Sequence, residues 1–416
     1  LVDLRPIWTF EPDIEILTGI VRRQLDLPES FPCVVKFLAE GAFNKVYSVQ
    51  CGNNTDVVVR VTLPVQPRLK TLRECATIQY IKHHTEIPAP LVFRYSVQRD
   101  DPLRFEWMIM ERVAGTKVKD QWRHMSWLKK QLLVHKIVAY LSQLFRNRFN
   151  QLGNIYAPKD IQEMTTEDKP DTVLLGAEHS CDKSGFVVGE IVSLPFFYDD
   201  HWSIGVFRGP YKHSRDWLTA YLQLAIHDAE KMKEEDDKED SSKEFTENSA
   251  KLGVRMLRLL PSIFPADNPE EYVLHHQDLS SNNMMVDENY DLSGIIDWEC
   301  VHTVPLWLAC QLPQFLRGQE RESPPPFAAD FENQYYEQAY YDDIEIHEKT
   351  CLREYFLEEM KRVCPEWVSV HDTSDIKADF EFAVSVCTVR GYGLCIDEWL
   401  DAVENGEKPD SLREDL

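Results

Sequence analysis

Long apolar runs, paired cysteines and internal repeats are all missing from this sequence. Without a run of about eighteen apolar residues, no membrane-spanning helix is predicted. The 10 cysteines are scattered from Cys33 to Cys395 with no CxxC pair, which predicts neither a zinc motif nor a disulfide framework. We therefore expect reduced thiols in a cytoplasmic protein. Because the chain starts at Leu1 instead of Met, a removed upstream targeting segment, for example a mitochondrial one, is also compatible with the sequence.

Positive charge is scarce as well. The sequence has 45 Lys and Arg residues against 70 Asp and Glu residues, a net charge of -25. Such a surface repels nucleic-acid phosphates, so we expect no nucleic-acid partner. It could attract a cationic small molecule, although solubility alone explains the charge. With 43% hydrophobic residues in 416, the chain has the composition of a globular protein of one or two structural units, and nothing indicates its oligomeric state.

The sequence pattern changes along the chain from short β-rich runs to longer stretches with helical spacing. A flanking helix is expected within residues 1–32, and a second helix at 70–84. Strands are predicted at residues 34–40, 45–50, 56–63, 91–97, 105–113 and 292–296. Beyond Gly115 the chain is mainly helical, with a long amphipathic stretch at 127–149. This order predicts an α+β protein whose antiparallel strands precede a mainly helical part.

A turn between the first two predicted strands carries a thinned glycine motif, Ala39-Glu40-Gly41-Ala42-Phe43-Asn44-Lys45-Val46-Tyr47. The kinase pattern G-x-G-x-x-G-x-V folds backbone amides over nucleotide phosphates, and this turn keeps only the middle glycine, Gly41. Asn44 stands at the third glycine position, where its tolerance of positive φ makes the replacement acceptable. Val46 would pack on an adenine ring. An ordinary hairpin turn explains the same residues equally well.

The third strand, VVVRV, has Arg60 where a kinase has its phosphate-binding lysine. Arginine keeps the charge and can bond phosphate with two donors, but it is larger and planar. Glu74 in the following helix is either its ion-pair partner or a surface carboxylate. Glu111 and Val113 end a strand where a hinge between lobes is expected, and their backbone groups could bond an adenine edge. The end of an ordinary strand is an equally open interpretation.

The segment HHQDLSSNNMMVDENYDLSGIIDWE contains the most specific spacing in the chain. Asp278 is followed five residues later by Asn283 and nineteen residues later by Asp297, which ends an apolar strand. Phosphoryl transfer requires an acceptor hydroxyl to be oriented and phosphate charge to be neutralised by magnesium. A loop carboxylate near the hydroxyl, with an amide and a second carboxylate as hard oxygen ligands, would meet both requirements.

The spacing H-x-D-(x4)-N followed by I-I-D-W-E resembles the catalytic and metal-binding segments of the aminoglycoside phosphotransferase and choline kinase-like family. The segments FNKVY, VVVRV, IPAP, MERVAG and HHQDLSSNN look most like the fungal branch of that family, over roughly residues 33–317. The resemblance implies a two-lobed, protein-kinase-like fold. The N-lobe at 33–113 would bind the nucleotide, and the C-lobe at 114–416 would contain an insertion at about 154–272.

The same resemblance implies the residues that do the chemistry. Asp278 would be the catalytic base or hydroxyl-orienting group, Asn283 and Asp297 would bind magnesium, and Arg60 would contact phosphate. Trp298 and Glu299 would shape the metal loop. The activity implied is an ATP- and magnesium-dependent transfer of a phosphoryl group to a hydroxyl of a small molecule.

Competing hypotheses differ in the use of these residues. No A-P-E-like activation segment follows Asp297, so a protein substrate is disfavoured. Arg60 and the thinned glycine turn motivate the alternative to the small-molecule kinase, a kinase-fold pseudoenzyme that acts as a binding or scaffolding protein. A metal hydrolase built on His275, His276 and Asp278 lacks further ligands. The acceptor would be bound by the insertion from Asn154 to Tyr272 or by the acidic stretch from Asp330 to Glu348, where Asp342, Asp343 and Glu345 either hold a cation or form a solvated helix face.

Overall fold

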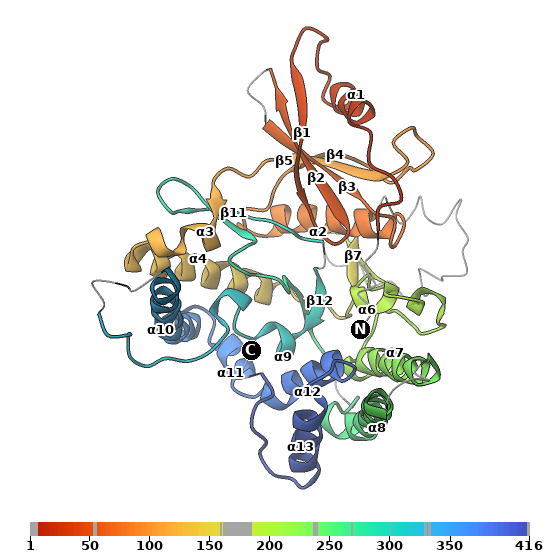
Figure 1. The fold of residues 1–416 in the computed structure, drawn as a ribbon, viewed down its shortest axis with the longest axis vertical. Coiled ribbons are helices and arrows are strands. Elements are labelled where there is room, and N and C mark those ends of the chain that lie inside the picture. The colour runs from red at the N-terminus through yellow and green to blue at the C-terminus, as the bar shows by residue number, and fades with distance from the viewer. Residues whose placement is uncertain are drawn as a thin grey trace. The chain divides into compact units, whose positions relative to one another are not determined.

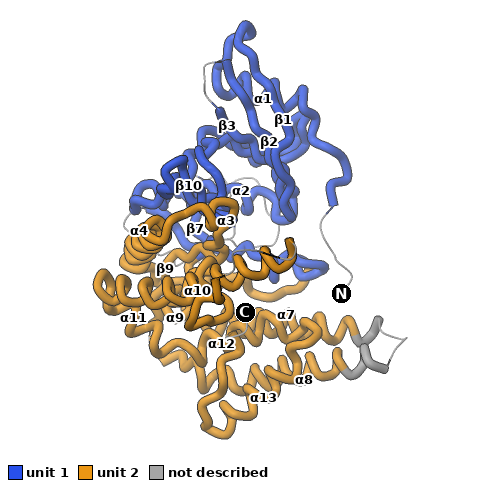
Figure 2. The backbone as a smooth tube through the Cα atoms, turned by 60° about the vertical axis from the view of Figure 1, so that its left-hand side comes forward, with its two compact units in different colours: residues 1–119, 154–202, 282–302 blue, residues 120–153, 203–281, 303–416 orange. Residues whose placement is uncertain are grey.

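The computed structural model describes residues 7–52, 56–158, 160, 185–235, 240–267, 269–299, 301–327, 331 and 334–413. Parts of the expected insertion, and Asp330 in the acidic stretch, lie outside these residues. The chain divides into two compact units, which Figure 2 colours separately. Unit 1 comprises residues 1–119, 154–202 and 282–302, and unit 2 comprises residues 120–153, 203–281 and 303–416.

Unit 1 contains a five-stranded antiparallel sheet with the strand order β1-β2-β3-β5-β4 (Figure 1). Its strands are β1 (Cys33–Glu40), β2 (Asn44–Cys51), β3 (Asp56–Thr62), β4 (Val92–Ser96) and β5 (Glu106–Glu111). These bounds confirm the five strands predicted in this part of the sequence. The sequence did not predict that β5 inserts between β3 and β4, which leaves β4 at the sheet edge.

The two faces of this sheet differ because side chains alternate along each strand. One face carries Tyr47, Val59 and Ile109, which are buried in a core with residues of helix α1 (Ile14–Gln24). The opposite face carries Arg60 and, directly across from it on β2, Val46. Strand alternation therefore separates the polar candidate residues from the apolar core of unit 1.

Helix α2 (Leu69–His84) follows β3 and contacts β4 and β5. Its first turn is capped by Glu106 of β5, whose carboxylate accepts the N–H of Arg68 at 2.6 Å and the hydroxyl of Thr71 at 2.5 Å. The first amides of a helix have no partner within the helix. At the start of α2 the Glu106 carboxylate accepts one of them, from Arg68, while the N–H groups of Leu69 and Lys70 donate to the carbonyls of Pro67 and Gln66. These hydrogen bonds join the start of α2 to β5, which lies between β3 and β4 in the sheet.

A second sheet in unit 1 joins three short strands in the order β11-β10-β6. They are β6 (Thr116–Lys117), β10 (Met284–Val286) and β11 (Leu292–Ile295). Gly115 precedes β6 with φ 109°, and a Cβ atom there would lie 2.1 Å from the carbonyl oxygen of Val286. Glycine is therefore required where the chain passes over β10.

The remaining elements of unit 1 form a small antiparallel pair and two short helical segments. These are β7 (Asn154–Tyr156), β8 (Val187–Gly189), α6 (Leu194–Phe197) and the 3₁₀ segment η2 (His201–Ser203). In β7 all three residues are buried.

Unit 2 is mainly helical, and its elements begin within α3 (Val118–Gln121). Its helices are η1 (Trp122–His124), α4 (Trp127–Arg146), α7 (Ser214–Glu235), α8 (Asp240–Ile263), α9 (Leu306–Ala309), η3 (Gln314–Leu316), α10 (Gln334–Val363), α11 (Pro365–His371), α12 (Asp375–Val386) and α13 (Gly393–Glu404). Strands β9 (Tyr272–His275) and β12 (His302–Pro305) pair with each other. Figure 1 shows α7 beside α8, and α4 contacts α10. None of the helices formed by described residues is long and apolar enough to cross a membrane.

The predicted α+β class is confirmed, because a small antiparallel sheet at the N-terminal end is followed by a mainly helical C-terminal part. The division into lobes at 33–113 and 114–416 stays a prediction. Both compact units take residues from the insertion at 154–272.

Candidate active site

The glycine turn between β1 and β2 is closed by a hydrogen bond from the Gly41 N–H to the Asn44 carbonyl, 2.9 Å long. Gly41 is exposed and has no positive φ, and the nearest atom to a Cβ built on it lies 4.0 Å away. Neither backbone strain nor packing therefore requires glycine here. The open space over the turn suits a ligand that approaches the backbone closely.

Asn44 does not have the positive φ that would have explained it as a glycine replacement, so that expectation was wrong. Asn44 is the first residue of β2, and its side-chain amide connects it to two other segments. The Nδ2 atom donates to Glu299 Oε2 at 2.6 Å, and the Oδ1 atom accepts the hydroxyl of Thr62 at 3.0 Å. Asn44 thus links the turn to β3 and to the segment that follows the predicted metal ligand.

Lys70 joins the same cluster from the first turn of α2. Its Nζ atom donates to Glu299 Oε2 at 2.6 Å and to Asn44 Oδ1 at 3.2 Å. The ring of Phe43, in the glycine turn, lies 5.8 Å from the same Nζ. One carboxylate oxygen therefore accepts hydrogen bonds from both an ammonium and an amide.

The ionised form of Glu299 is strongly favoured in this cluster. Burial alone would raise the pKa of Glu299, but the charges of Lys70 and Arg60 and the hydrogen bonds from Lys70 and Asn44 outweigh burial. Together they lower the pKa of Glu299 from 4.5 to about 2. Glu299 is therefore a fixed negative charge at neutral pH.

Arg60 forms the ion pair with Glu74 that the sequence suggested, through Nη2 of the guanidinium and Oε2 of the carboxylate. Both side chains are buried. Among the described residues, Arg60 Nε and Glu74 Oε1 have no hydrogen-bond partner. A buried donor without an acceptor is costly, and a phosphate oxygen at this position would remove the cost.

The hinge candidates lie at the end of β5. The Glu111 N–H donates to the Leu91 carbonyl at 2.8 Å, so this N–H is already used and the carbonyl is the remaining candidate for an adenine contact. Val113 lies against Gly294 of β11, where a Cβ atom would come within 2.4 Å of the valine side chain. Val46 is half-buried opposite Arg60, on the face of the sheet away from the apolar core.

The two predicted magnesium ligands come together in unit 1. Asn283 immediately precedes β10, and its carbonyl accepts the N–H of Ile296 at 2.9 Å, next to Asp297. Asp297 is exposed and has φ 65°, in the left-handed region that Asp tolerates better than most residues. Trp298 is buried and donates its indole N–H to the Ile295 carbonyl at 2.8 Å, which fixes the turn around Asp297. An amide and a carboxylate are thus held on adjacent backbone.

Asp278 belongs to unit 2, because the boundary between the units falls between Ser281 and Asn282. It lies in the turn after β9 and is exposed. The following Leu279 is buried, and its carbonyl accepts the N–H of Phe315 at 3.2 Å. His276 is buried as well. The loop is therefore anchored just after the exposed carboxylate by Leu279, and the buried His276 lies two residues before it.

The donor atoms in unit 1 fit the predicted magnesium and ATP. Magnesium in phosphotransferases is usually held by one or two carboxylates with phosphate oxygens and water, and Asn283 with Asp297 supplies oxygen donors of that kind. The unpartnered Arg60 Nε and the unfilled space over Gly41 suit phosphate. No group of three His, Cys, Asp or Glu side chains that could hold a metal occurs among the residues described.

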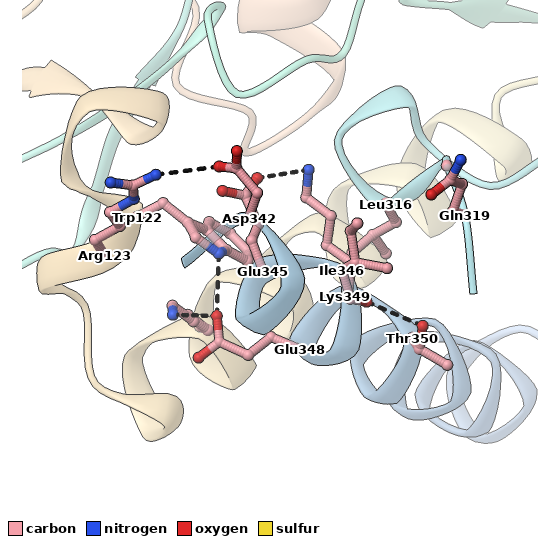
Figure 3. Close-up of polar contacts among 12 residues, drawn as sticks. Trp122, Arg123, Leu316, Gln319, Asp342, Glu345, Ile346, Glu348, Lys349 and Thr350 are labelled. Atoms are coloured by element: carbon pink, nitrogen blue, oxygen red, sulfur yellow. Dashed lines mark hydrogen bonds and ion pairs between the residues drawn. The ribbon is translucent and has the colours of Figure 1, made fainter. Parts of the chain in front are cut away.

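The acidic stretch on α10 is paired by cations of unit 2. Asp342 Oδ1 lies 3.1 Å from Arg123 Nη2, and Glu348 Oε2 accepts from Lys130 at 2.6 Å and from the Trp122 indole at 3.2 Å (Figure 3). Asp343 pairs with Arg321 at 3.2 Å, and Glu345 pairs with Lys349 at 2.8 Å. These carboxylates therefore stabilise contacts of α10 and are not an open site for a cationic ligand.

Nothing in the sequence singled out Lys70, and the resemblance suggested for Glu299 only a role in shaping the metal loop, not the contacts with Lys70 and Asn44. The positions are far apart in the chain, so no local pattern joins them. One signal was available: Lys70 precedes Glu74 by four residues, which puts both on one face of α2.

A family model described as the phosphotransferase enzyme family matches residues 34–342. A subtelomeric hrmA-associated cluster protein of Aspergillus fumigatus is 27% identical over 42% of this chain and 32% of its own length. Altered inheritance of mitochondria protein 9, mitochondrial, of Meyerozyma guilliermondii is 22% identical over 68% of this chain and 50% of its own length. The chain thus spans a third to a half of the length of these curated relatives.

Two solved structures align with most of this chain. An ADP-bound aminoglycoside phosphotransferase, APH(2'')-Ib, is 14% identical, with a TM-score of 0.46 over 95% of this chain and 98% of that chain. An ethanolamine kinase of Plasmodium vivax is 13% identical, with a TM-score of 0.44 over 99% of this chain and 88% of that chain.

Proposed function

The chain belongs to the phosphotransferase enzyme family, and from this premise we propose that it is an ATP- and magnesium-dependent kinase that phosphorylates a hydroxyl group of a small molecule. The family itself was predicted from the spacing of Asp278, Asn283 and Asp297, and that prediction is confirmed. The observation that carries the proposal is the turn of unit 1 in which Asn283 and Asp297 stand on adjacent, hydrogen-bonded backbone.

The metal would be held by Asn283 and Asp297. When bound, magnesium neutralises charge on the transferring phosphoryl group. The protein's part is to keep the Asp297 carboxylate exposed and oriented, which the left-handed backbone and the Trp298 hydrogen bond achieve. A rigid ligand pair of this kind lowers the cost of assembling the site.

The nucleotide would be held by the polar face of the sheet in unit 1. Arg60 is oriented by Glu74 and still has an unused donor for phosphate, while the turn at Gly41 leaves room for a close backbone approach. Val46 would lie against the base, and the carbonyl of Glu111 and the backbone of Val113 would meet its edge. These roles remain proposals.

Asp278 would orient the acceptor hydroxyl and take its proton as the new O–P bond forms, while the bond from the γ-phosphorus to the bridging oxygen breaks and ADP leaves. An exposed carboxylate next to the buried Leu279 suits that task, because it can reach a bound substrate while Leu279 holds the loop. The paired acids of α10 give no support to a cationic acceptor, so the acceptor is defined only as a small molecule with a hydroxyl group.

The competing hypothesis is a kinase-fold pseudoenzyme that binds or scaffolds. It was motivated by Arg60, but the Arg60–Glu74 ion pair reproduces the lysine–glutamate pair that active kinases need. Restoring lysine separates the two hypotheses. The kinase proposal expects activity in the natural protein, whereas activity that arises only in Arg60→Lys would identify a degenerate scaffold.

The proposed function is tested by magnesium-ATP turnover across a panel of amino-alcohols, aminoglycosides, sugars and nucleosides, with thermal shift measured in parallel. A kinase would turn over at least one acceptor class and be stabilised by nucleotide. The absence of both turnover and stabilisation across the whole panel would contradict the proposal.

The cytoplasmic location stays a prediction, and the name of the Meyerozyma guilliermondii relative describes that protein as mitochondrial.

A further inference from the structure

Lys70 is a buried cation to which the proposed function gives no role. Only 2% of its side chain is exposed, in the first turn of α2. Burying an ammonium group is costly unless it is paired and hydrogen-bonded. Its partners come from the two segments on which nucleotide chemistry would depend: Asn44 and Phe43 at the glycine turn, and Glu299 two residues after Asp297.

The Glu299 carboxylate is the negatively charged group that lies against Lys70 and Asn44, and we call its place the anion position. Among the described residues, it is the only carboxylate that an ion pair joins to Lys70. Its Oε2 atom accepts from both Lys70 and Asn44, each at 2.6 Å. The Glu299 side chain is 15% exposed, against 2% for Lys70. A ligand that arrives from solvent would therefore meet the carboxylate first and reach Lys70 only by replacing it.

Arg60 adds a second donor to the same surroundings. Its charge acts on both Lys70 and Glu299, and its Nε atom is buried without an acceptor among the described residues. Two buried cations, one of them with an unused donor, form a site that suits a group with more acceptor oxygens than one carboxylate has. Phosphate is such a group.

We propose that Lys70 is a phosphate-contacting residue of the nucleotide site, and that the Glu299 carboxylate holds this anion position until a phosphate replaces it. The inference rests on the proposed kinase function and adds to it a second cation, supplied by α2 in addition to Arg60 of β3. Glu74, one turn further along α2, orients Arg60. Helix α2 would thus supply one phosphate-binding residue, Lys70, and position the other, Arg60.

A purely structural role for the same cluster predicts the opposite effect of one substitution. If Glu299 only braces the glycine turn, removing its charge loosens the turn and weakens nucleotide binding. If Glu299 stands in for phosphate, Glu299→Gln removes a competing negative charge and strengthens the binding of magnesium-free nucleotide. The direction of the change in affinity therefore separates the two roles.

The test is titration calorimetry of the whole chain with magnesium-free ADP and with inorganic tripolyphosphate. The variants are Lys70→Met, Lys70→Arg, Glu299→Gln and the double variant of Lys70→Met with Glu299→Gln. Lys82→Met is the matched control, because Lys82 is an exposed lysine on the same helix. Circular dichroism and thermal unfolding of each variant report on folding.

Lys70→Met is expected to weaken ADP binding by about tenfold to a hundredfold, the range of one charge-assisted hydrogen bond. Lys70→Arg should restore most of the affinity, Glu299→Gln should raise affinity about threefold or more, and Lys82→Met should leave affinity unchanged. If the single variant Lys70→Met does not fold, the role of Lys70 is tested by the ADP affinity of the double variant, which removes both charges of the pair. It should bind ADP more weakly than Glu299→Gln.

Equal ADP affinity in Glu299→Gln and the double variant would overturn the role of Lys70 while leaving the kinase function intact. Reduced affinity in Glu299→Gln would overturn the stand-in role and make Glu299 a brace. Binding of tripolyphosphate that depends on Lys70, without any binding of ADP, would support the phosphate contact and overturn its place in a nucleotide site. Binding of neither probe by the natural protein would overturn the role of Lys70, while turnover of magnesium-ATP across the acceptor panel decides the kinase proposal.

Discussion

Gly41 is a residue that the fold of unit 1 does not need. Its φ is not positive, and a Cβ atom would have ordinary contacts only. Gly115 has the opposite character, since its φ of 109° and the nearby Val286 carbonyl both require glycine. The fold therefore requires glycine at position 115 and does not require it at position 41, where the proposed approach of phosphate would be the reason for glycine.

Gly41→Ala is expected to leave the free energy of unfolding unchanged or to raise it by up to about 1 kcal/mol, because alanine restricts the unfolded chain. Nucleotide affinity should fall about tenfold, which corresponds to about 1.4 kcal/mol, as the methyl group enters the phosphate approach. Urea unfolding and nucleotide titration measure the two effects. Gly19→Ala in α1, where a Cβ atom meets nothing within 4 Å, is the control and should leave affinity unchanged. Unchanged affinity in Gly41→Ala would contradict a phosphate-binding turn.

Residue-level prediction from the sequence succeeded where a known spacing could be used. The Arg60–Glu74 ion pair followed from the strand and helix that carry the two residues. The Lys70–Glu299 ion pair did not, because 229 positions separate its partners and neither residue stands in a motif for the pair. The reason given for Asn44 was wrong, since its φ is not positive and its contacts to Glu299 and Thr62 come from the side chain. Its part in nucleotide binding stays a prediction.

At the scale of elements, α2 is the part of unit 1 on which the proposed nucleotide site depends. It carries both Lys70 and Glu74, and its first turn is fixed by the Glu106 carboxylate. Strand β5 thereby controls the position of a helix that it does not adjoin in sequence. The stability of this cap should affect binding as well as folding.

Glu106→Gln is expected to destabilise the protein by about 1–2 kcal/mol, because an amide cannot accept both hydrogen bonds of the carboxylate with the same strength. Amide hydrogen exchange in the first turn of α2 should accelerate more than exchange in α1, and nucleotide affinity should fall. Asp100→Asn, an exposed carboxylate between β4 and β5, is the control. Equal exchange rates in α2 of the natural protein and Glu106→Gln would show that the cap does not hold the helix.

Long, patterned elements were predicted well from the sequence, and short ones were not. Strands β1, β2, β3 and β5 and helices α2 and α4 are long enough for local composition and spacing to indicate them. Strand β6 has two residues and β10 three, too few for a pattern. Their sheet exists because distant segments pair, and local sequence does not encode that pairing.

At the scale of the whole molecule, each compact unit combines segments from distant parts of the chain. The proposed catalytic residue Asp278 and the proposed metal ligands Asn283 and Asp297 belong to different units, although Asn283 follows Asp278 by only five positions. The sequence predicted these residues because their spacing is specific. It did not predict the grouping into units, which depends on long-range packing.

Unit 2 contains a carboxyl group that should affect stability in a pH-dependent way. Burial raises the pKa of Glu381 from 4.5 to about 7, while Arg317 and Arg413 partly oppose the rise. Between these values the unfolded chain loses the proton and the folded chain keeps it, so stability falls as pH rises through this window. Below pH 4.5 the group contributes nothing.

Glu381→Gln should therefore raise the free energy of unfolding by about 2 kcal/mol more at pH 8 than at pH 5. Urea unfolding at the two pH values measures the difference, and Glu398→Gln on α13, an exposed glutamate, should show none. A gain for Glu381→Gln that is the same at both pH values would contradict a raised pKa.

The central claim is that Asn283 and Asp297 bind magnesium for a transfer in which Asp278 takes the hydroxyl proton. The most direct measurement is nucleotide affinity with and without magnesium, together with ATP turnover, for the natural protein, Asp297→Asn and Asp278→Asn. Asp297→Asn should lose the effect of magnesium on nucleotide affinity, and Asp278→Asn should keep that effect while turnover falls by about a hundredfold or more. Magnesium-dependent binding and turnover that survive Asp297→Asn unchanged would contradict the account.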